Sequence, residues 1–167
     1  MMRSFISCAL LVSLIYLGAP ASTPAKDNTG KEGGQGYVFA GFGAVNLEDS
    51  AIHFGGGGEV NLYKGLGLGV EVGYLSPIHY MGEGIGILSL DGQYTFGTGG
   101  PGKVRPFLTG GYTLAFRNGH ANAINFGGGV HYWFTRKVGL RLEFRDHVSP
   151  DLWNAHAWQG RFGFDFR

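Results

Sequence analysis

The sequence predicts an all-β chain folded as an eight-stranded antiparallel up-and-down transmembrane β-barrel, and three observations favour this fold class. Apolar and polar residues alternate in eight consecutive segments, which is typical of half-buried strands. Nearly all the charged residues inside these segments lie on one face, and they include arginine but no lysine. The chain also begins with the pattern of an export signal.

The N-terminal segment has the three parts of a secretory signal peptide. Arg3 supplies a positive charge, Phe5–Leu17 an apolar region and Ala19–Ala21 a small-residue cleavage site. The apolar run is too short to span a bilayer as a helix. The expected organisation is a signal peptide at 1–21, a flexible periplasmic leader at 22–36 and an outer-membrane barrel at 37–167.

The composition excludes several classes of function. Cys8 lies in the expected signal peptide, so the exported chain has no thiol for disulfides, thiolate catalysis or metal binding. Without Arg3, the remaining 12 Lys and Arg residues balance 12 Asp and Glu residues, so net charge does not recruit nucleic acid. Glycine is 32 of 167 residues, which favours strands that approach bulky neighbours closely.

The first four strands are predicted at 37–46, 52–62, 66–75 and 85–96. The first is apolar on both faces, so its inward face is not assigned. In the second, the run Gly55–Gly58 has two interpretations. Either large side chains of neighbouring strands cross this strand, or the barrel wall bends here. In the third, leucine and valine at even positions alternate with glycines and Glu71. In the fourth, Asp91 alternates with apolar and aromatic residues.

The last four strands are predicted at 104–116, 122–134, 138–146 and 157–166. Even-numbered positions are mostly apolar in all four. Odd-numbered positions carry polar side chains, such as Arg105 in the fifth strand and His131 in the sixth. The seventh, within VGLRLEFRDHVSP, places two arginines and a glutamate on one face.

Lysine placement predicts that the polar face is the inside of the barrel. A solvated strand face carries lysine freely, but Lys64, Lys103 and Lys137 all lie in predicted turns. Arginine is the cation suited to buried, bidentate ion pairs with carboxylates. We therefore expect nine structural lumen charges: Glu59, Glu71, Asp91, Arg105, Arg141, Glu143, Arg145, Arg161 and Asp165.

The apolar face is expected to meet lipid. Its aromatic residues lie mostly towards strand ends, where two interfacial girdles would form. The segments also have the ~9–11 residues that a tilted transmembrane strand needs. External loops of such barrels are longer than periplasmic turns. Short turns are expected at 63–65, 97–103 and 135–137, and external loops at 47–51, 76–84, 117–121 and 147–156.

The signal peptide, the eight segments, GLRLEFRDHVSP and the closing RFGFDFR resemble the small outer-membrane β-barrels of the OmpA/OmpX type. The resemblance covers Tyr37 to Arg167. It implies a chain that ends in an aromatic residue read by the barrel-assembly machinery. Phe164 and Phe166 fit that signal, whereas Arg167 departs from it.

An enzymatic alternative rests on His147-Val148-Ser149. Outer-membrane lipid A deacylases of the PagL family are similar barrels that carry a His-x-Ser pair and a downstream glutamate. A histidine beside a serine, oriented by a carboxylate, is the arrangement of acyl hydrolysis. No glutamate follows Glu143, however. His147 and Ser149 also have odd numbers, like the charged residues of the lumen face, so they are expected to point away from lipid. We expect a strand-end histidine and a turn serine, and no enzyme.

The expected function is therefore structural, in the envelope, or interactive, through the external loops. No cofactor or metal is expected, because the histidines have no ligand spacing. The expected partners are outer-membrane lipid and lipopolysaccharide and the barrel-assembly machinery, with no nucleic acid and a monomeric state. A secreted soluble barrel that binds a ligand is a third possibility.

Overall fold

The computed structural model describes residues 33–45, 49–97, 101–150 and 155–167. The signal peptide and most of the leader predicted above lie outside these ranges. The strands are β1 (Gln35–Val45), β2 (Asp49–Tyr63), β3 (Leu66–Pro77), β4 (Ile85–Thr95), β5 (Val104–Phe116), β6 (His120–Trp133), β7 (Val138–Ser149) and β8 (Ala155–Phe166). One 3-10 turn, η1 (Met81–Glu83), precedes β4. No helix in the described part of the chain is long and apolar enough to cross a membrane.

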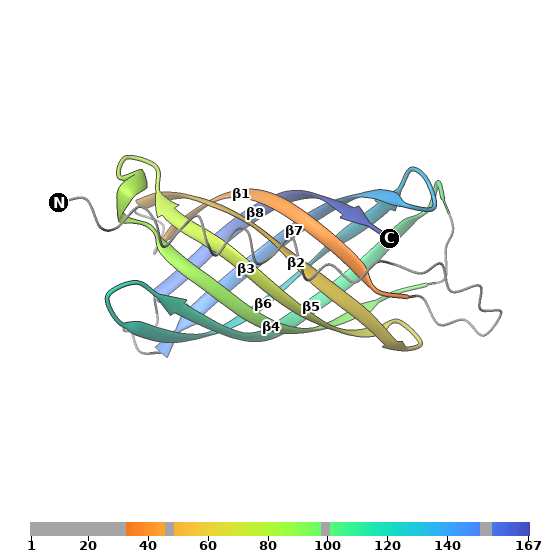
Figure 1. The fold of residues 1–167 in the computed structure, drawn as a ribbon, viewed down its shortest axis with the longest axis horizontal. Coiled ribbons are helices and arrows are strands. Elements are labelled where there is room, and N and C mark those ends of the chain that lie inside the picture. Colours follow the sequence, from red (N-terminus) through yellow and green to blue (C-terminus); the bar gives the residue numbers. More distant parts are fainter. Residues whose placement is uncertain (1–32, 46–48, 98–100, 151–154) are drawn as a thin grey trace, which may run out of the picture.

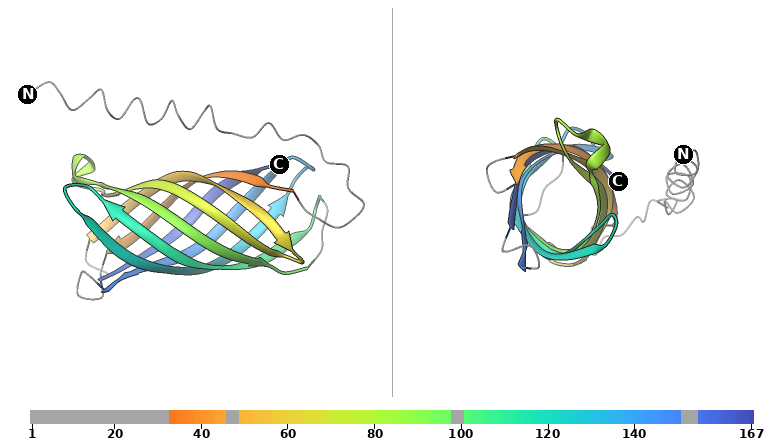
Figure 2. Two further views of the ribbon diagram at one scale, coloured as in Figure 1. Left: turned by 60° about the horizontal axis from the view of Figure 1, so that its bottom comes forward. Right: turned by 90° about the vertical axis from the view of Figure 1, so that its left-hand side faces the viewer.

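The eight strands form one closed barrel in sequence order (Figure 1). Each strand pairs antiparallel with the next, and β1 pairs with β8 to close the sheet. Seen along its axis, the barrel is a round, single-layered wall (Figure 2). Closure matters physically because it leaves no sheet edge with unpaired backbone groups. The predicted fold class is confirmed.

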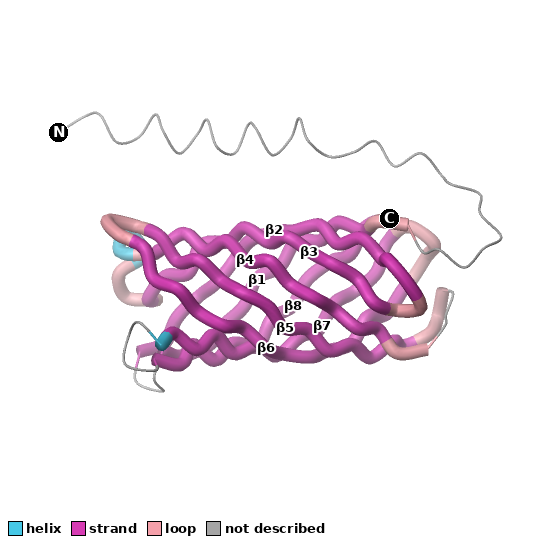
Figure 3. Tube along the Cα trace, turned by 90° about the horizontal axis from the view of Figure 1, so that it is seen from below, coloured by secondary structure: helices cyan, strands magenta, loops and turns pink. Residues whose placement is uncertain are grey.

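Strands make up most of the barrel (Figure 3), and six of the eight begin or end beyond the segments expected from hydrophobic alternation. β1 begins at Gln35, inside the expected leader, and β7 continues to Ser149 because Ser149 pairs with Ala155 of β8. Backbone pairing does not need apolar side chains, so polar residues near the rim stay in the ladder. The expectation that the seventh strand ends at 146 and the eighth starts at 157 is wrong.

This extension removes the expected difference between long external and short periplasmic connections. We call the end where β1 starts and β8 stops the terminal end, and the opposite end the distal end (Figure 1). The distal connections shrink to residues 46–48, 78–84, 117–119 and 150–154. The terminal connections are 64–65, 96–103 and 134–137. The connection after β4 is thus the longest, and loop length does not orient this barrel.

Side-chain direction follows residue parity around the barrel. Even-numbered apolar residues such as Leu68 and Leu108 are 55 % and 58 % exposed on the outer wall. Odd-numbered positions point inwards and are mostly buried. The same rule assigns β1, where Tyr37 and Phe39 are buried in the lumen and Val38 faces out.

The glycine run of β2 makes room for the large inward side chains of β1. An added Cβ at Gly57 would lie 2.7 Å from the Tyr37 hydroxyl and 2.6 Å from the Val70 carbonyl oxygen. The outward Gly58 has no such neighbour, since its nearest atom, the Gln35 carbonyl oxygen, is 3.9 Å away. The first interpretation of the run, large neighbours that cross the strand, therefore holds for Gly57.

Gly57→Ala is expected to destabilise the barrel by about 1–3 kcal/mol, because the methyl group overpacks the lumen against Tyr37. Gly58→Ala is the matched control, one residue along the same strand, and should be nearly neutral. The temperature at which each variant loses its fast-migrating folded band on an unheated SDS gel measures the effect. Equal midpoints for the two variants would contradict the packing argument.

Candidate functional site in the charged lumen

All nine charged residues expected in the lumen lie inside the barrel. None is more than 6 % exposed, and Glu71 and Asp165 are fully buried. They come from six strands, β2 to β5, β7 and β8, so the charges meet only because the sheet closes. The inner face is therefore a set of buried ionic groups, which must be paired to be tolerated.

Arg145 is the centre of the largest cluster. Its Nε donates to the Glu143 carboxylate at 2.5 Å, and one terminal nitrogen donates to Asp91 Oδ2 at 2.8 Å. The same nitrogen lies 3.7 Å from Glu71. Asn125 donates to the other Asp91 oxygen at 2.7 Å. Charge-assisted contacts of this kind hold three strands together across the lumen.

Arg161 reaches the same cluster from β8. It donates to Glu71 and lies 3.5 Å from Glu143 Oε1. Its guanidinium also covers the ring of Phe39, 3.5 Å from the centroid. The Tyr37 hydroxyl donates to Glu71 at 2.9 Å, so the aromatic residues of β1 fill space and also take part in the network.

A second cluster lies nearer the terminal end around Arg141. Its guanidinium donates to Glu59 at 3.2 Å and to Gln93 at 2.6 Å, and its Nε lies 3.6 Å from Asp165. His131 Nδ1 is 2.6 Å from the other Asp165 oxygen. Arg141 also packs on two rings, with centroid distances of 4.1 Å to Tyr37 and 4.8 Å to Phe107.

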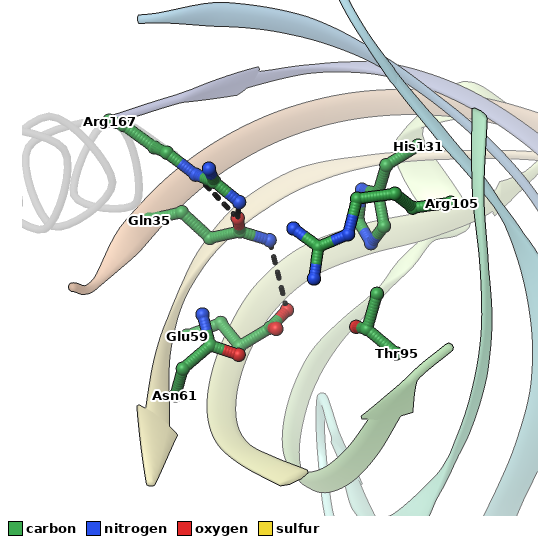
Figure 4. A pocket seen from close by; sticks show the side chains of 7 residues that line it. All are labelled: Gln35, Glu59, Asn61, Thr95, Arg105, His131 and Arg167. Carbon is green, nitrogen blue, oxygen red and sulfur yellow. Dashed lines mark hydrogen bonds between the residues drawn. The ribbon is translucent and has the colours of Figure 1, made fainter. Parts of the chain in front are cut away.

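Between this cluster and the terminal mouth lies a narrow pocket with almost no free volume (Figure 4). It is lined by Gln35, Glu59, Asn61, Thr95, Arg105, His131 and Arg167. Gln35 contacts Glu59 at 3.4 Å, and Arg167 contacts Gln35 at 3.4 Å. Arg167 also covers the Trp133 ring at 3.9 Å. These side chains cross the mouth and narrow it.

His147 and Ser149 lie inside the distal half and have different partners. His147 Nδ1 is 3.2 Å from the Thr113 hydroxyl, whereas the Ser149 hydroxyl donates to the Asn122 carbonyl oxygen at 2.8 Å. Both side chains are buried, at 7 % and 8 % exposure. Neither faces the outer wall, where a lipid substrate would lie. No contact in the described residues joins them into a nucleophile–base pair.

His53, like His147, is buried in the lumen, where its Nδ1 lies 2.6 Å from Gln159. Within the described ranges, no three His, Cys, Asp or Glu side chains come together in a group that could hold a metal ion.

Comparison with known proteins places this barrel in a family. The model of the outer membrane protein beta-barrel domain matches residues 8–166. The chain belongs to this family. A comparison with curated proteins gave no match.

Solved structures of the outer-membrane barrel class share the fold. The N-terminal barrel of OprF from Pseudomonas aeruginosa is 19 % identical, with a TM-score of 0.61, and the match covers 79 % of this chain and 96 % of that one. Neisserial surface protein A is 15 % identical, with a TM-score of 0.66 and coverage of 82 % and 98 %. A de novo designed transmembrane β-barrel is 15 % identical, with a TM-score of 0.54 and coverage of 81 % and 97 %.

Membership of the outer membrane protein β-barrel family makes the outer wall a lipid-facing surface. Its apolar side chains, including Phe42 at 65 % exposure, suit hydrocarbon and not water. Phe164 and Phe166, the residues expected to form the assembly signal, both point outwards and are exposed. Arg167, which departs from that signal, turns into the mouth instead.

One polar pair on the outer wall escaped the sequence interpretation. Asp146 of β7 and His156 of β8 occupy even-numbered, outward positions, and Asp146 Oδ2 lies 2.8 Å from His156 Nδ1. Asp146 was the last residue of the predicted seventh strand but was not counted among the strand charges, and His156 lay outside the predicted eighth strand. Asp146 has an even number, like the apolar residues that face outwards, and this feature of the sequence could have identified the pair.

Glu143→Leu is expected to destabilise the barrel by about 3–5 kcal/mol, because Arg145 and Arg161 then lose a shared carboxylate while staying buried. Loss of the folded band on heating, followed on SDS gels, measures this. Glu83→Leu, which changes an exposed glutamate in η1, is the control. Wild-type stability of Glu143→Leu would mean that water, and not ion pairing, solvates the lumen charges.

Proposed function

We propose that this protein is a structural component of the outer membrane: a small monomeric barrel whose lumen is plugged by paired charges and whose wall contributes to envelope integrity. The observation that carries the proposal is the two clusters of buried ion pairs around Arg145 and Arg141. Eight strands enclose a lumen that side chains can fill, whereas diffusion channels need a wider barrel. A filled lumen leaves the wall and the rims as the surfaces that can act.

The lumen chemistry supports this proposal over transport. A selective channel keeps polar groups unpaired along a water-filled path so that a solute can replace its hydration shell. Here Arg141, Arg145 and Arg161 are paired with carboxylates. Arg141 is also covered by the rings of Tyr37 and Phe107, and Arg161 by the ring of Phe39. A solute would have to break several charge-assisted hydrogen bonds at once in a confined space. The lumen therefore suits a rigid plug.

Envelope integrity can be tested in cells that lack the protein. We expect these cells to grow poorly in SDS and to leak a periplasmic reporter enzyme. Wild-type protein and Ser149→Ala should restore the barrier, whereas Glu143→Leu should restore it less because less folded barrel accumulates. Unchanged detergent resistance in the deletion strain would contradict a structural role. Loss of one acyl chain from lipid A, seen by mass spectrometry and abolished by Ser149→Ala, would instead establish the deacylase alternative.

Contact at the cell surface is a second candidate, favoured by the distal connection between β3 and β4. Ile78, Tyr80 and Met81 are 43 %, 65 % and 52 % exposed there. The connection is also held in place: the Tyr74 hydroxyl donates to the Met81 carbonyl oxygen at 2.9 Å, and Arg117 donates to the Glu83 carbonyl oxygen at 2.7 Å. A fixed apolar tip suits contact with an apolar surface.

Adhesion of intact cells to hexadecane droplets tests this second candidate. The double variant Tyr80→Ser, Met81→Ser should lower the fraction of cells that partition to the droplets. Tyr63→Ser is the matched control, because Tyr63 is as exposed as Tyr80 but lies at the terminal end. An equal decrease in the two variants, or none in either, would argue against the distal tip.

A further inference from the structure

The inner face of the barrel changes from charged to apolar towards the distal end. β4 shows the change along a single strand. From the distal to the terminal end, its inward positions are Ile85, Ile87, Ser89, Asp91, Gln93 and Thr95. Ile87 is buried like Asp91, but only Asp91 takes part in the ion pairs around Arg145. The distal end of the lumen is therefore lined by a different kind of side chain from its centre.

Apolar side chains pack together at this distal end. Ala51 of β2, Leu75 of β3 and Ile87 of β4 form a buried cluster. Four partly buried residues pack against it: Val45 of β1, Ile85 of β4, Ala115 of β5 and Ala157 of β8. We call these seven residues the apolar distal cluster. They come from six of the eight strands, so the cluster extends around most of the inner circumference.

Hydroxyl and imidazole groups lie directly below the apolar distal cluster. The hydroxyls of Ser89 and Thr113 are 2.8 Å apart, and Thr113 also contacts His147. Nε2 of His53, Nε2 of His147 and, deeper in the lumen, Oε2 of Glu143 are buried without a hydrogen-bond partner among the described residues. Buried polar atoms that no protein group satisfies are typically bonded to ordered water. We therefore expect ordered water below the apolar distal cluster.

The two ends of the lumen differ in the path that they offer to this water. The terminal mouth is narrow, but it is lined by polar side chains such as Gln35, Asn61 and Thr95, which can bond to water molecules (Figure 4). The apolar distal cluster has no side-chain donor or acceptor. A narrow apolar constriction excludes water, because water cannot replace there the hydrogen bonds that it gives up. The geometry thus allows hydration from the terminal end and opposes it at the distal end.

We infer that the apolar distal cluster is the barrier to water and protons in this barrel, whereas the paired charges exclude larger solutes. This inference rests on the plugged lumen proposed above, and it adds where along the axis the plug is dry. Protons need a barrier of their own, since chains of carboxylates, imidazoles and water molecules can relay a proton through a membrane protein. The ion pairs around Arg145 and Arg141 supply such groups, so they cannot stop a proton in the way that an apolar layer does.

Proton flux into phosphatidylcholine vesicles that contain the full barrel tests this barrier. Pyranine inside the vesicles reports the internal pH after an acid step outside, and valinomycin with potassium removes the membrane potential. We expect wild-type vesicles to be as tight as protein-free ones, and Ile87→Thr vesicles to acidify faster because the hydroxyl hydrates the apolar distal cluster. Ile124→Thr is the matched control, the same substitution at a residue that is 59 % exposed on the outer wall.

The outcomes separate this inference from the proposed function. A proton leak through wild-type protein, above that of protein-free vesicles, would contradict the plugged lumen itself. Tight vesicles with both wild-type protein and Ile87→Thr would overturn the distal barrier and leave the plugged lumen in place. An equal leak with Ile87→Thr and Ile124→Thr would also overturn the distal barrier, because the leak would then come from a disturbed contact with lipid.

A second variant guards against misfolding of the first. Leu75→Thr changes the apolar distal cluster from another strand and should also speed acidification. Its control is Leu108→Thr, because Leu108 is exposed on the outer wall. Only variants that give a heat-modifiable folded band are compared. If Ile87→Thr gives none, Leu75→Thr decides the result by the same criteria.

Discussion

The pairing of arginine with carboxylate inside a closed wall is the interaction on which the rest of this structure depends. An eight-stranded barrel is too narrow to leave its lumen to bulk water, so each buried guanidinium needs an acidic partner from another strand. Arg145 joins β7 to Glu71 and Asp91 on the opposite wall, and Arg161 joins β8 to Glu71. Strand order, register and lumen packing are therefore coupled: a slip of one residue would turn every charge towards lipid.

Which side chains face the lumen could largely be predicted from the sequence, because side chains in a strand point alternately inwards and outwards. Parity places Glu59, Glu71 and Arg141 inside and most leucines outside, and arginine without lysine identifies the polar face as the lumen. What could not be predicted is which charges meet. Arg141 and Glu59 are 82 residues apart in the sequence, and their contact depends on barrel closure and strand tilt. Local sequence patterns contain no information about either. Strand ends were also missed, since backbone pairing carries His147 and Ser149 into the ladder beyond the apolar pattern.

The same extension of the strands changes the balance between the functional interpretations. With the distal connections reduced to short links, less chain projects from the rim, and the barrel itself makes up most of the described chain. His147 and Ser149 follow the parity of Arg145 into the lumen, so their side chains are separated from lipid by the wall itself. The apparent catalytic pair is thus better explained by the alternation that places every odd residue of β7 inside.

Asp146 is the exception to the parity rule among the described strands, because it is a charged residue at an outward position. Inside the barrel, a carboxylate is held by arginines from several strands; outside, no cation of that kind is present among the described strand positions. Within the described residues, His156 of the neighbouring strand contacts it, and Trp158 stacks on the imidazole. A carboxylate on the lipid-facing wall is therefore tolerated because side chains of the neighbouring strand pair with it and shield it from lipid.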